Sequence, residues 1–352
     1  MPWLVTTRLE KDNSMQISAG KRKALQSLSD NRGVIAALAI DQRGALRKLF
    51  SAATGIEPSQ IPRENLEKFK EAVSRILTPY ASAILLDPEI GLSAAAQRAK
   101  NSGLLLAYEQ TGFDKSVAGR LPRLLDGWSV RKLVAAGANG IKTLLYYSPL
   151  SVPVVNEQKQ RWVQQVGEEC AGEDVPYFLE IVAYHDDMDE KSREFALLKP
   201  EVVTRAVAEF SDAKYQVDIL KVGVPVNMNF VGGPGTATSP AYTREQAKEY
   251  FRQASAAAKK PFIYLSEGVS NELFSETLAL AAEAGANFSG VLCGRATWKD
   301  GVPVFAARGM NALEDWLSDE GVKNIQRVNA RLSAAKPWFQ FRDAVAGTAV
   351  TS

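Results

Sequence analysis

Three charged residues stand inside apolar, strand-like runs of this 352-residue chain: Lys142, Glu180 and Lys221. Strands of a parallel sheet are nearly continuous Val, Ile and Leu, and burying a cation in one is costly unless it is paired or loses its proton. A desolvated lysine that has lost its proton is an amine nucleophile, and it attacks carbonyl carbons to form a Schiff base. These residue types therefore indicate covalent chemistry on a carbonyl compound.

Each of these charges also has a structural interpretation. Lys221 could be a strand-end lysine that reaches solvent or pairs with Asp218, and any single charge in a strand could belong to a structural ion pair. However, inward residues of adjacent strands meet in layers, so the three charges are expected to converge with Asp41 in one polar cluster. Two lysines and two carboxylates would neutralise each other there while favouring proton loss from one lysine. Three charges on consecutive strands favour catalysis.

The elements that must position this cluster are eight apolar runs, which alternate with amphipathic segments. The predicted strands are residues 34–40, 83–86, 104–108, 140–146, 177–182, 218–227, 262–265 and 288–293. The predicted helices include residues 18–29, 63–77, 129–136, 155–171, 200–211, 243–258, 272–284 and 306–317. This alternation predicts an α/β fold, a (β/α)8 TIM barrel forming a single domain with extra terminal helices. A doubly wound open sheet is the alternative, but no Gly-x-Gly-x-x-Gly follows the first strand.

In such a barrel the active site lies at the carboxyl ends of the strands. The first three strands end near polar residues, namely Asp41, Arg43, Asp87, Glu89, Glu109 and Gln110. Strands seven and eight end in the glycine-bearing turns 266–270 and 293–296, which contain Ser266, Ser270 and Arg295. Backbone N–H groups, a hydroxyl and a guanidinium at these two loops predict a phosphate site. The alternative is that the glycines only permit tight turns.

Composition excludes several functional classes. The net charge is +2, from 42 basic and 40 acidic residues, and no basic arm indicates nucleic acid or an anionic membrane as a partner. Cys170 and Cys293 lie in no metal-type spacing and are expected to be reduced thiols. No apolar run approaches the roughly 20 residues of a membrane span, and residues 1–20 lack a signal-peptide core. A cytoplasmic protein is therefore expected.

The chain contains a single histidine, His185, which is expected in a solvated loop after the fifth strand. A zinc site with three imidazoles, a Ser-His-Asp triad or a histidine phosphate carrier all draw on histidine. Metal-dependent aldol chemistry with three histidine ligands is thereby excluded, and no metal site is expected.

Seven ordered runs, between about Ser18 and Trp338, resemble the class I tagatose-1,6-bisphosphate aldolase family. They are residues 37–46, 85–92, 105–109, 142–147, 178–181, 220–228 and 290–301. Residues 18–338 are accordingly expected to form the barrel, with 1–17 as an N-terminal extension and 339–352 as a C-terminal tail. The resemblance implies an enzyme without metal or cofactor. It would reversibly split D-tagatose 1,6-bisphosphate, and also epimers such as fructose 1,6-bisphosphate, into dihydroxyacetone phosphate and glyceraldehyde 3-phosphate.

The resemblance also implies roles for individual residues. The Schiff-base lysine of the family falls on Lys221, its acid/base glutamate on Glu180, its second lysine on Lys142 and its first-strand aspartate on Asp41. The contacts to the phosphate of the dihydroxyacetone half fall on Ser266, Gly268, Gly294 and Arg295, with Gln42 nearby. The expected partner is a small-molecule ketose bisphosphate, with no nucleic acid and no membrane, and the expected assembly is a homo-oligomer, either a dimer or a tetramer.

The chemistry requires these residue types. Lys221 would add to the C2 carbonyl, and Glu180 would protonate the departing hydroxyl to leave an iminium that acts as an electron sink. Glu180 or Asp41 would then remove the C4 hydroxyl proton as the C3–C4 bond breaks. Lys142, a neighbouring cation, is expected to favour proton loss from Lys221 and to keep the carboxylates ionised.

Two positions depart from the family pattern: Gly223 stands where a glutamate is expected, and Glu267 where a small residue is expected. One hypothesis is that a carboxylate moved from strand six to strand seven while facing the same cluster. The alternatives to the bisphosphate aldolase are a class I aldolase for another phosphorylated or sulfonated ketose, and a non-catalytic sugar-phosphate-binding regulator. The retained charged residues argue against the regulator. Residues 232–235 could form a mobile lid or an ordinary surface loop.

Overall fold

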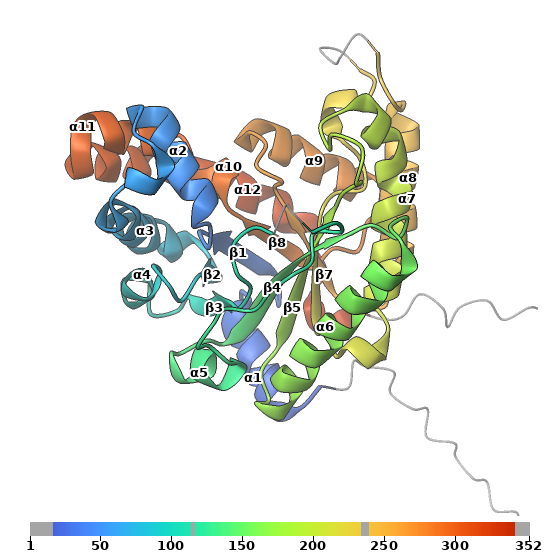
Figure 1. Cartoon of the computed structure of the whole chain (residues 1–352). Coiled ribbons are helices and arrows are strands. Elements are labelled where there is room, and N and C mark those ends of the chain that lie inside the picture. The colour runs from blue at the N-terminus through green and yellow to red at the C-terminus, as the bar shows by residue number, and fades with distance from the viewer. Residues whose placement is uncertain (1–16, 114–116, 234–238, 342–352) are drawn as a thin grey trace, which may run out of the picture.

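Eight parallel strands close into a barrel in sequence order (Figure 1). The computed structural model describes residues 17–113, 117–233 and 239–341. The strands are β1 (Ile35–Ala39), β2 (Ala83–Leu86), β3 (Gly103–Ala107), β4 (Gly140–Tyr147), β5 (Tyr177–Ala183), β6 (Ile219–Val222), β7 (Phe262–Leu265) and β8 (Gly290–Cys293). Each predicted strand is present, and the predicted TIM barrel is confirmed. The lid prediction falls partly on Pro234 and Gly235, which lie outside the described residues.

The helices surround this barrel (Figure 1). They are α1 (Ala19–Leu28), α2 (Gly44–Thr54), α3 (Arg63–Leu77), α4 (Leu92–Ala96), α5 (Val130–Ala135), α6 (Pro153–Gly172), α7 (Arg193–Phe210), α8 (Arg244–Ala257), α9 (Asn271–Glu283), α10 (Arg295–Trp298), α11 (Gly301–Trp316) and α12 (Val322–Ala330). The predicted start of α11 at residue 306 was late, and Gly309, with φ of 78°, interrupts this helix. In the part of the chain that the structure describes, no helix is long and apolar enough to cross a membrane.

The predicted start of α7 at residue 200 was wrong by seven residues. Proline is favoured in the first turn of a helix, but here Pro200 lies in the interior, and the helix begins after the N-cap Ser192. A proline cannot donate to the carbonyl four residues earlier, which belongs to Ala196. The hydroxyl of Tyr242 donates to that carbonyl at 2.7 Å instead. A tertiary contact thus replaces the missing helical hydrogen bond.

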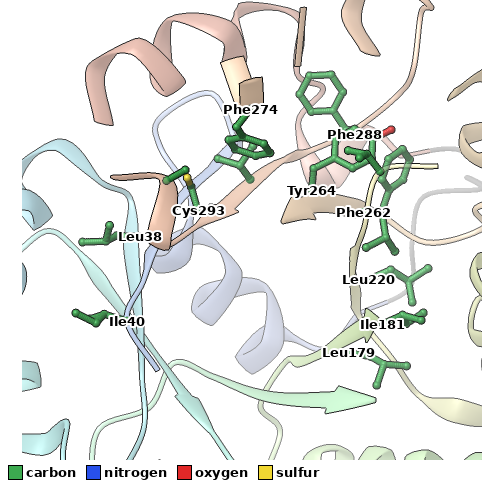
Figure 2. Packing of buried hydrophobic residues seen from close by; sticks show 14 of the residues in the cluster. Leu38, Ile40, Leu179, Ile181, Leu220, Phe262, Tyr264, Phe274, Phe288 and Cys293 are labelled. Carbon is green, nitrogen blue, oxygen red and sulfur yellow. The ribbon is translucent and has the colours of Figure 1, made fainter. Parts of the chain in front are cut away.

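Apolar side chains form two separate layers. The outer layer lies between the strands and the helices, and Figure 2 shows Leu38, Leu179 and Leu220 pointing away from the barrel axis. The inner layer fills the barrel, and it includes Leu25 and Leu28 from α1 together with Trp338. Since α1 contacts the first residues of β3 and β4, it covers the amino-terminal end of the barrel.

Alternation along the strands decides which charges point inward. Phe178 and Ile219 belong to the inner layer, so Glu180 and Lys221, each two residues further on, face the same way. Glu180 is also the direct partner of Lys221 in the β5–β6 pairing. Lys142 on β4 pairs with Phe178 one layer lower. The barrel therefore places its inward charges above an apolar base, toward the carboxyl ends of the strands.

Candidate active site

The predicted cluster forms around the ammonium group of Lys142. Its Nζ lies 2.9 Å from Asp41 Oδ2, 2.6 Å from Glu109 Oε1 and 2.8 Å from Glu180 Oε2. Glu180 Oε2 also lies 2.8 Å from Lys221 Nζ, so this carboxylate bridges the two lysines. All five side chains are buried. The structure thus brings together the four residues predicted to be catalytic.

Lys221 neither reaches solvent nor pairs with Asp218, so these two alternatives for it are wrong. Lys221 is only 3 % exposed, which excludes a side chain that extends into solvent. Asp218 does not pair with it, because the Asp218 carboxylate accepts hydrogen bonds from Lys21 Nζ at 2.7 Å and from the Tyr177 amide at 2.9 Å. The strand alternation separates the two residues: three positions apart, Asp218 and Lys221 face opposite sides of the sheet.

Glu109 is a member of the cluster that the sequence identified only as a polar residue near a strand end. It follows β3, whose inward residues Leu105 and Ala107 belong to the inner apolar layer. Continuing that period of two by one step places Glu109 inside the barrel, beside Lys142. The alternation along β3 thus predicts the inward position of Glu109.

Mutual charges set the ionisation of the cluster. Burial would raise the pKa of Asp41, but Lys142 and Lys221 together outweigh it and lower this pKa below its ordinary value. The pKa of Glu180 is lowered in the same way, against the effect of burial. Burial would lower the pKa of Lys142, but its three carboxylate neighbours raise it well above the usual value. Lys142 is therefore a fixed cation at neutral pH.

Glu109 behaves differently from the other two carboxyl groups. Burial raises its pKa, Lys142 opposes that effect, and the neighbouring charge of Asp41 adds to it. Of the three, Glu109 is thus the carboxyl group that most readily holds a proton.

A cavity of about 690 Å³ opens above the cluster. Asp41, Glu109, Lys142 and Glu180 line it, and Lys221 contacts this wall through Glu180. A carbonyl carbon that is to reach the Lys221 amine must therefore enter beside Glu180. The position at the carboxyl ends of the strands is the one expected for the active site of a TIM barrel.

The residues predicted to contact phosphate gather on one side of this cavity. Gln42, Ser266, Gly268 and Arg295 line it. Gly268 has a φ of 78°, and a Cβ placed on it would stand 2.6 Å from Arg295 Cζ, so the guanidinium packs directly on this glycine.

Gly294 connects this side of the cavity to the start of the barrel. A Cβ on Gly294 would stand 2.8 Å from the Ala39 carbonyl oxygen and 3.5 Å from Gln42 Nε2. Gln42 Nε2 in turn donates to Asp41 Oδ1 at 3.1 Å. The five residues predicted to contact phosphate therefore form a continuous rim, from β7 across β8 to the end of β1, that reaches the charged cluster. They are Gln42, Ser266, Gly268, Gly294 and Arg295.

Other strand-end residues serve the scaffold. Asp87 forms a fully buried ion pair with Lys70 of α3 and accepts the amide N–H groups of Glu89 and Ile90. Arg43 lines the cavity, but it is tied to Glu89 and donates to the Glu109 carbonyl oxygen at 2.8 Å. These contacts fix the loops after the first three strands.

His185 and the cysteines take no part in the site. His185 lies in the loop after β5, where its Nδ1 accepts the Asp187 amide at 3.1 Å. Cys170 and Cys293 are both free and buried. Within the described ranges, no group of three His, Cys, Asp or Glu side chains is arranged to hold a metal ion.

The two departures from the family pattern meet in space. A Cβ placed on Gly223 would stand 2.3 Å from Glu267 Oε1, so the Glu267 carboxylate occupies the room that a side chain at position 223 would fill. Its other oxygen lies 2.6 Å from Lys199 Nζ. Glu267 and Lys199 both line the cavity, whereas the carboxylates that contact Lys142 are those of Asp41, Glu109 and Glu180.

Comparison with known proteins gives consistent results. Residues 35–300 match the DeoC/LacD family aldolases. The chain is 52% identical over 326 residues to tagatose 1,6-diphosphate aldolase 2 of Enterococcus faecalis, covering 92% of this chain and 97% of that protein. It is 48% identical to the tagatose 1,6-diphosphate aldolase of Staphylococcus haemolyticus, covering 92% of this chain and 99% of that protein.

Two solved structures share the fold. Fructose-bisphosphate aldolase from Plasmodium falciparum superposes with a TM-score of 0.66 at 15% identity, covering 93% of this chain and 99% of that one. A Schiff-base-forming fructose-1,6-bisphosphate aldolase gives a TM-score of 0.54 at 14% identity, covering 88% and 98%. At such low identity the likeness concerns the barrel alone.

Proposed function

The chain belongs to the DeoC/LacD family of aldolases, and we propose that it is a class I enzyme that forms a Schiff base through Lys221. The proposed substrate is D-tagatose 1,6-bisphosphate, with epimers such as fructose 1,6-bisphosphate as further candidates. The products are dihydroxyacetone phosphate and glyceraldehyde 3-phosphate. The observation that carries this proposal is the Glu180 carboxylate oxygen, 2.8 Å from the ammonium groups of both lysines.

The contact between Glu180 and Lys221 provides a route for the protons of Schiff-base formation. An ammonium and a ketone yield an iminium and one water molecule, so two protons must pass from nitrogen to the C2 oxygen. Glu180, ionised at rest, can accept each proton from Lys221 and deliver it to that oxygen. Lys142 keeps its own proton and holds the carboxylates in place, which leaves Lys221 as the nucleophile.

Carbon–carbon cleavage then needs one base. Removal of the C4 hydroxyl proton makes C4 the carbonyl carbon of the aldehyde product, and the electron pair of the C3–C4 bond passes through C2 to the iminium nitrogen, giving an enamine. Asp41 and Glu180 are the candidates, since both are ionised and line the cavity. Protonation at C3 and hydrolysis by water release dihydroxyacetone phosphate and restore Lys221.

Cations on two sides of the cavity support a substrate with two phosphates. Arg295 follows β8, and the rim formed with Ser266, Gly268, Gly294 and Gln42 would hold the C1 phosphate. In a closed barrel of eight strands β4 lies opposite β8, and Arg120 packs 5.3 Å from the ring of Tyr146 on β4. The second phosphate would approach this opposite wall, which Arg123 and Lys191 also line.

The direct test is cleavage in the presence of a metal chelator. Purified protein should cleave D-tagatose 1,6-bisphosphate faster than any sulfonated ketose phosphate, and Lys221→Met should lower kcat by at least about 1000-fold. Lys259→Met, which removes an exposed lysine on the outer surface, is the matched control and should keep full activity. Faster cleavage of a sulfonated ketose would favour the related aldolase, and a folded protein without any cleavage would favour the regulator.

The remaining expectations concern the whole protein. We propose a homo-oligomer, a dimer or a tetramer, located in the cytoplasm. Light scattering of the purified protein would give the mass of the assembly. A monomer at micromolar concentration would contradict this part of the proposal.

A further inference from the structure

Glu267 is a carboxylate of the cavity wall for which the reaction above has no use. It follows Ser266 at the end of β7, and its Oε1 lies over Gly223, two residues beyond Lys221. Lys221 and Gly223 face the same side of the chain because of the period of two. The carboxylate therefore stands about one layer above the nucleophile, roughly 6–7 Å further along β6.

Lys199 fixes this carboxylate from the side. It comes from α7, its side chain is 7% exposed, and its Nζ lies 2.6 Å from Glu267 Oε2. The same ammonium group lies 3.5 Å from the Val226 carbonyl oxygen, on the loop after β6. An ionised carboxylate has about four lone-pair positions, so a bond to Lys199 leaves Glu267 able to accept further hydrogen bonds.

The backbone conformation of Glu267 directs its side chain toward β6. Glu267 has a φ of 50°, in the left-handed region that a residue with a Cβ adopts only at some cost. Gly268, the next residue, also has a positive φ, and the Arg295 guanidinium packs directly against it. Two consecutive residues thus face different sides: Gly268 supports the guanidinium toward β8, and Glu267 extends toward β6.

We propose that Glu267, positioned by Lys199, accepts a hydrogen bond from a hydroxyl group of the ketose chain and sets which hydroxyl configuration the enzyme prefers. This inference rests on the proposed function. A carboxylate repels phosphate, so the ligand group at this point is neutral and must be a donor. Hydroxyl groups are the neutral donors that a sugar phosphate offers. A site built to bond one hydroxyl discriminates against a substrate that places it elsewhere.

The test measures kcat/KM for four epimers, the 1,6-bisphosphates of D-tagatose, D-fructose, D-sorbose and D-psicose. Glu267→Gln and Glu267→Ala should lower kcat/KM for the preferred epimer by about 10- to 100-fold, the usual effect of one charged hydrogen bond, and change the ranking. Lys199→Met should shift the ranking in the same direction. Glu272→Gln is the matched control, because this exposed α9 glutamate pairs with Arg327 outside the cavity, and the ranking should stay unchanged.

A second pair of variants tests the contact between Gly223 and the Glu267 carboxylate. Gly223→Ala places a methyl group where Glu267 Oε1 lies, so it should alter the ranking without touching Glu267. The double variant Gly223→Glu/Glu267→Gly returns a carboxylate to the same space from β6, and it should recover part of the wild-type ranking that Glu267→Gly alone loses.

The outcomes separate this inference from the proposed function. An unchanged ranking, or an equal loss for all four epimers, in Glu267→Gln and Glu267→Ala would mean that the ion pair only supports the loop, and this would overturn the inference. Wild-type protein that cleaves none of the four would overturn the proposed function, and this inference with it.

Discussion

Lys142 joins three strands through its side chain alone. Its ammonium group contacts carboxylates that follow β1 and β3 and one that lies on β5. The pKa of Lys142 is raised, and those of Asp41 and Glu180 are lowered. The lysine therefore stabilises the charged form of the two carboxylates, and they stabilise its charged form. Lys142 thus holds the site together, and in the proposed mechanism it leaves Lys221 as the reactive amine.

Substituting Lys142 should therefore cost stability as well as activity. Lys142→Met leaves Asp41 and Glu109 without their cation, whereas Glu180 keeps Lys221 as its partner. Breaking a buried charge pair typically costs about 3–5 kcal/mol. We expect the free energy of unfolding to fall by about this amount in urea denaturation. Lys142→Met/Glu109→Gln should recover part of the loss, because it removes one of the two buried carboxyl groups that have lost their partner. A loss below about 1 kcal/mol would contradict the electrostatic role.

The pH dependence of this loss has a definite sign. In the wild type the lowered pKa values of Asp41 and Glu180 give stability that is present above about pH 4.5 and lost as the pH falls through those values. In Lys142→Met the buried carboxyl groups of Asp41 and Glu109 have lost their cation and should have raised pKa values, so the folded state binds more protons than the unfolded state near neutral pH. The variant should therefore become more stable from pH 8 to pH 5, which denaturation at several pH values would measure.

At the scale of elements, the turns after β7 and β8 form a unit that holds Arg295. The Arg295 guanidinium rests on Gly268, so the glycine is needed for two reasons, its positive φ and the absence of a Cβ. Ser266 and Gly294 complete the rim on either side. The unit would bind the part of the substrate that does not react, and its disturbance should affect affinity more than chemistry.

Gly268→Ala tests this unit. Its methyl group would meet Arg295 Cζ at 2.6 Å and displace the guanidinium, so we expect KM for the bisphosphate to rise by about 10-fold or more, with a smaller change in kcat. Gly285→Ala is the matched control: Gly285 has a φ of 74° and nothing within 4 Å, so the same backbone strain arises without displacing Arg295. Equal KM values in the two variants would show that strain alone causes the effect.

In the whole molecule, the apolar core and the candidate active site lie at opposite ends of the barrel axis. Leu25, Leu28 and Trp338 close the amino-terminal end, and the charged cluster and cavity occupy the carboxyl end. This division follows from the alternation of each strand, which directs apolar residues inward at the base and charged residues inward one layer higher.

That alternation is also why much of the molecule could be predicted from its sequence. The apolar runs gave the eight strands, and the period of two placed Lys142, Glu180 and Lys221 together. Local patterns do not contain contacts between distant residues. The hydroxyl of Tyr242 that permits Pro200 inside α7 and the pairing of Lys70 with Asp87 depend on tertiary packing. The meeting of Glu267 with Gly223 likewise requires the closed barrel.

Reductive trapping tests Schiff-base formation at Lys221 directly. The protein is incubated with dihydroxyacetone phosphate and sodium borohydride, digested, and analysed by peptide mass spectrometry. A stable adduct on Lys221, absent from Lys221→Met, is the predicted result. An adduct on Lys142 would exchange the roles of the two lysines. Folded protein without an adduct on any lysine would contradict the Schiff-base mechanism.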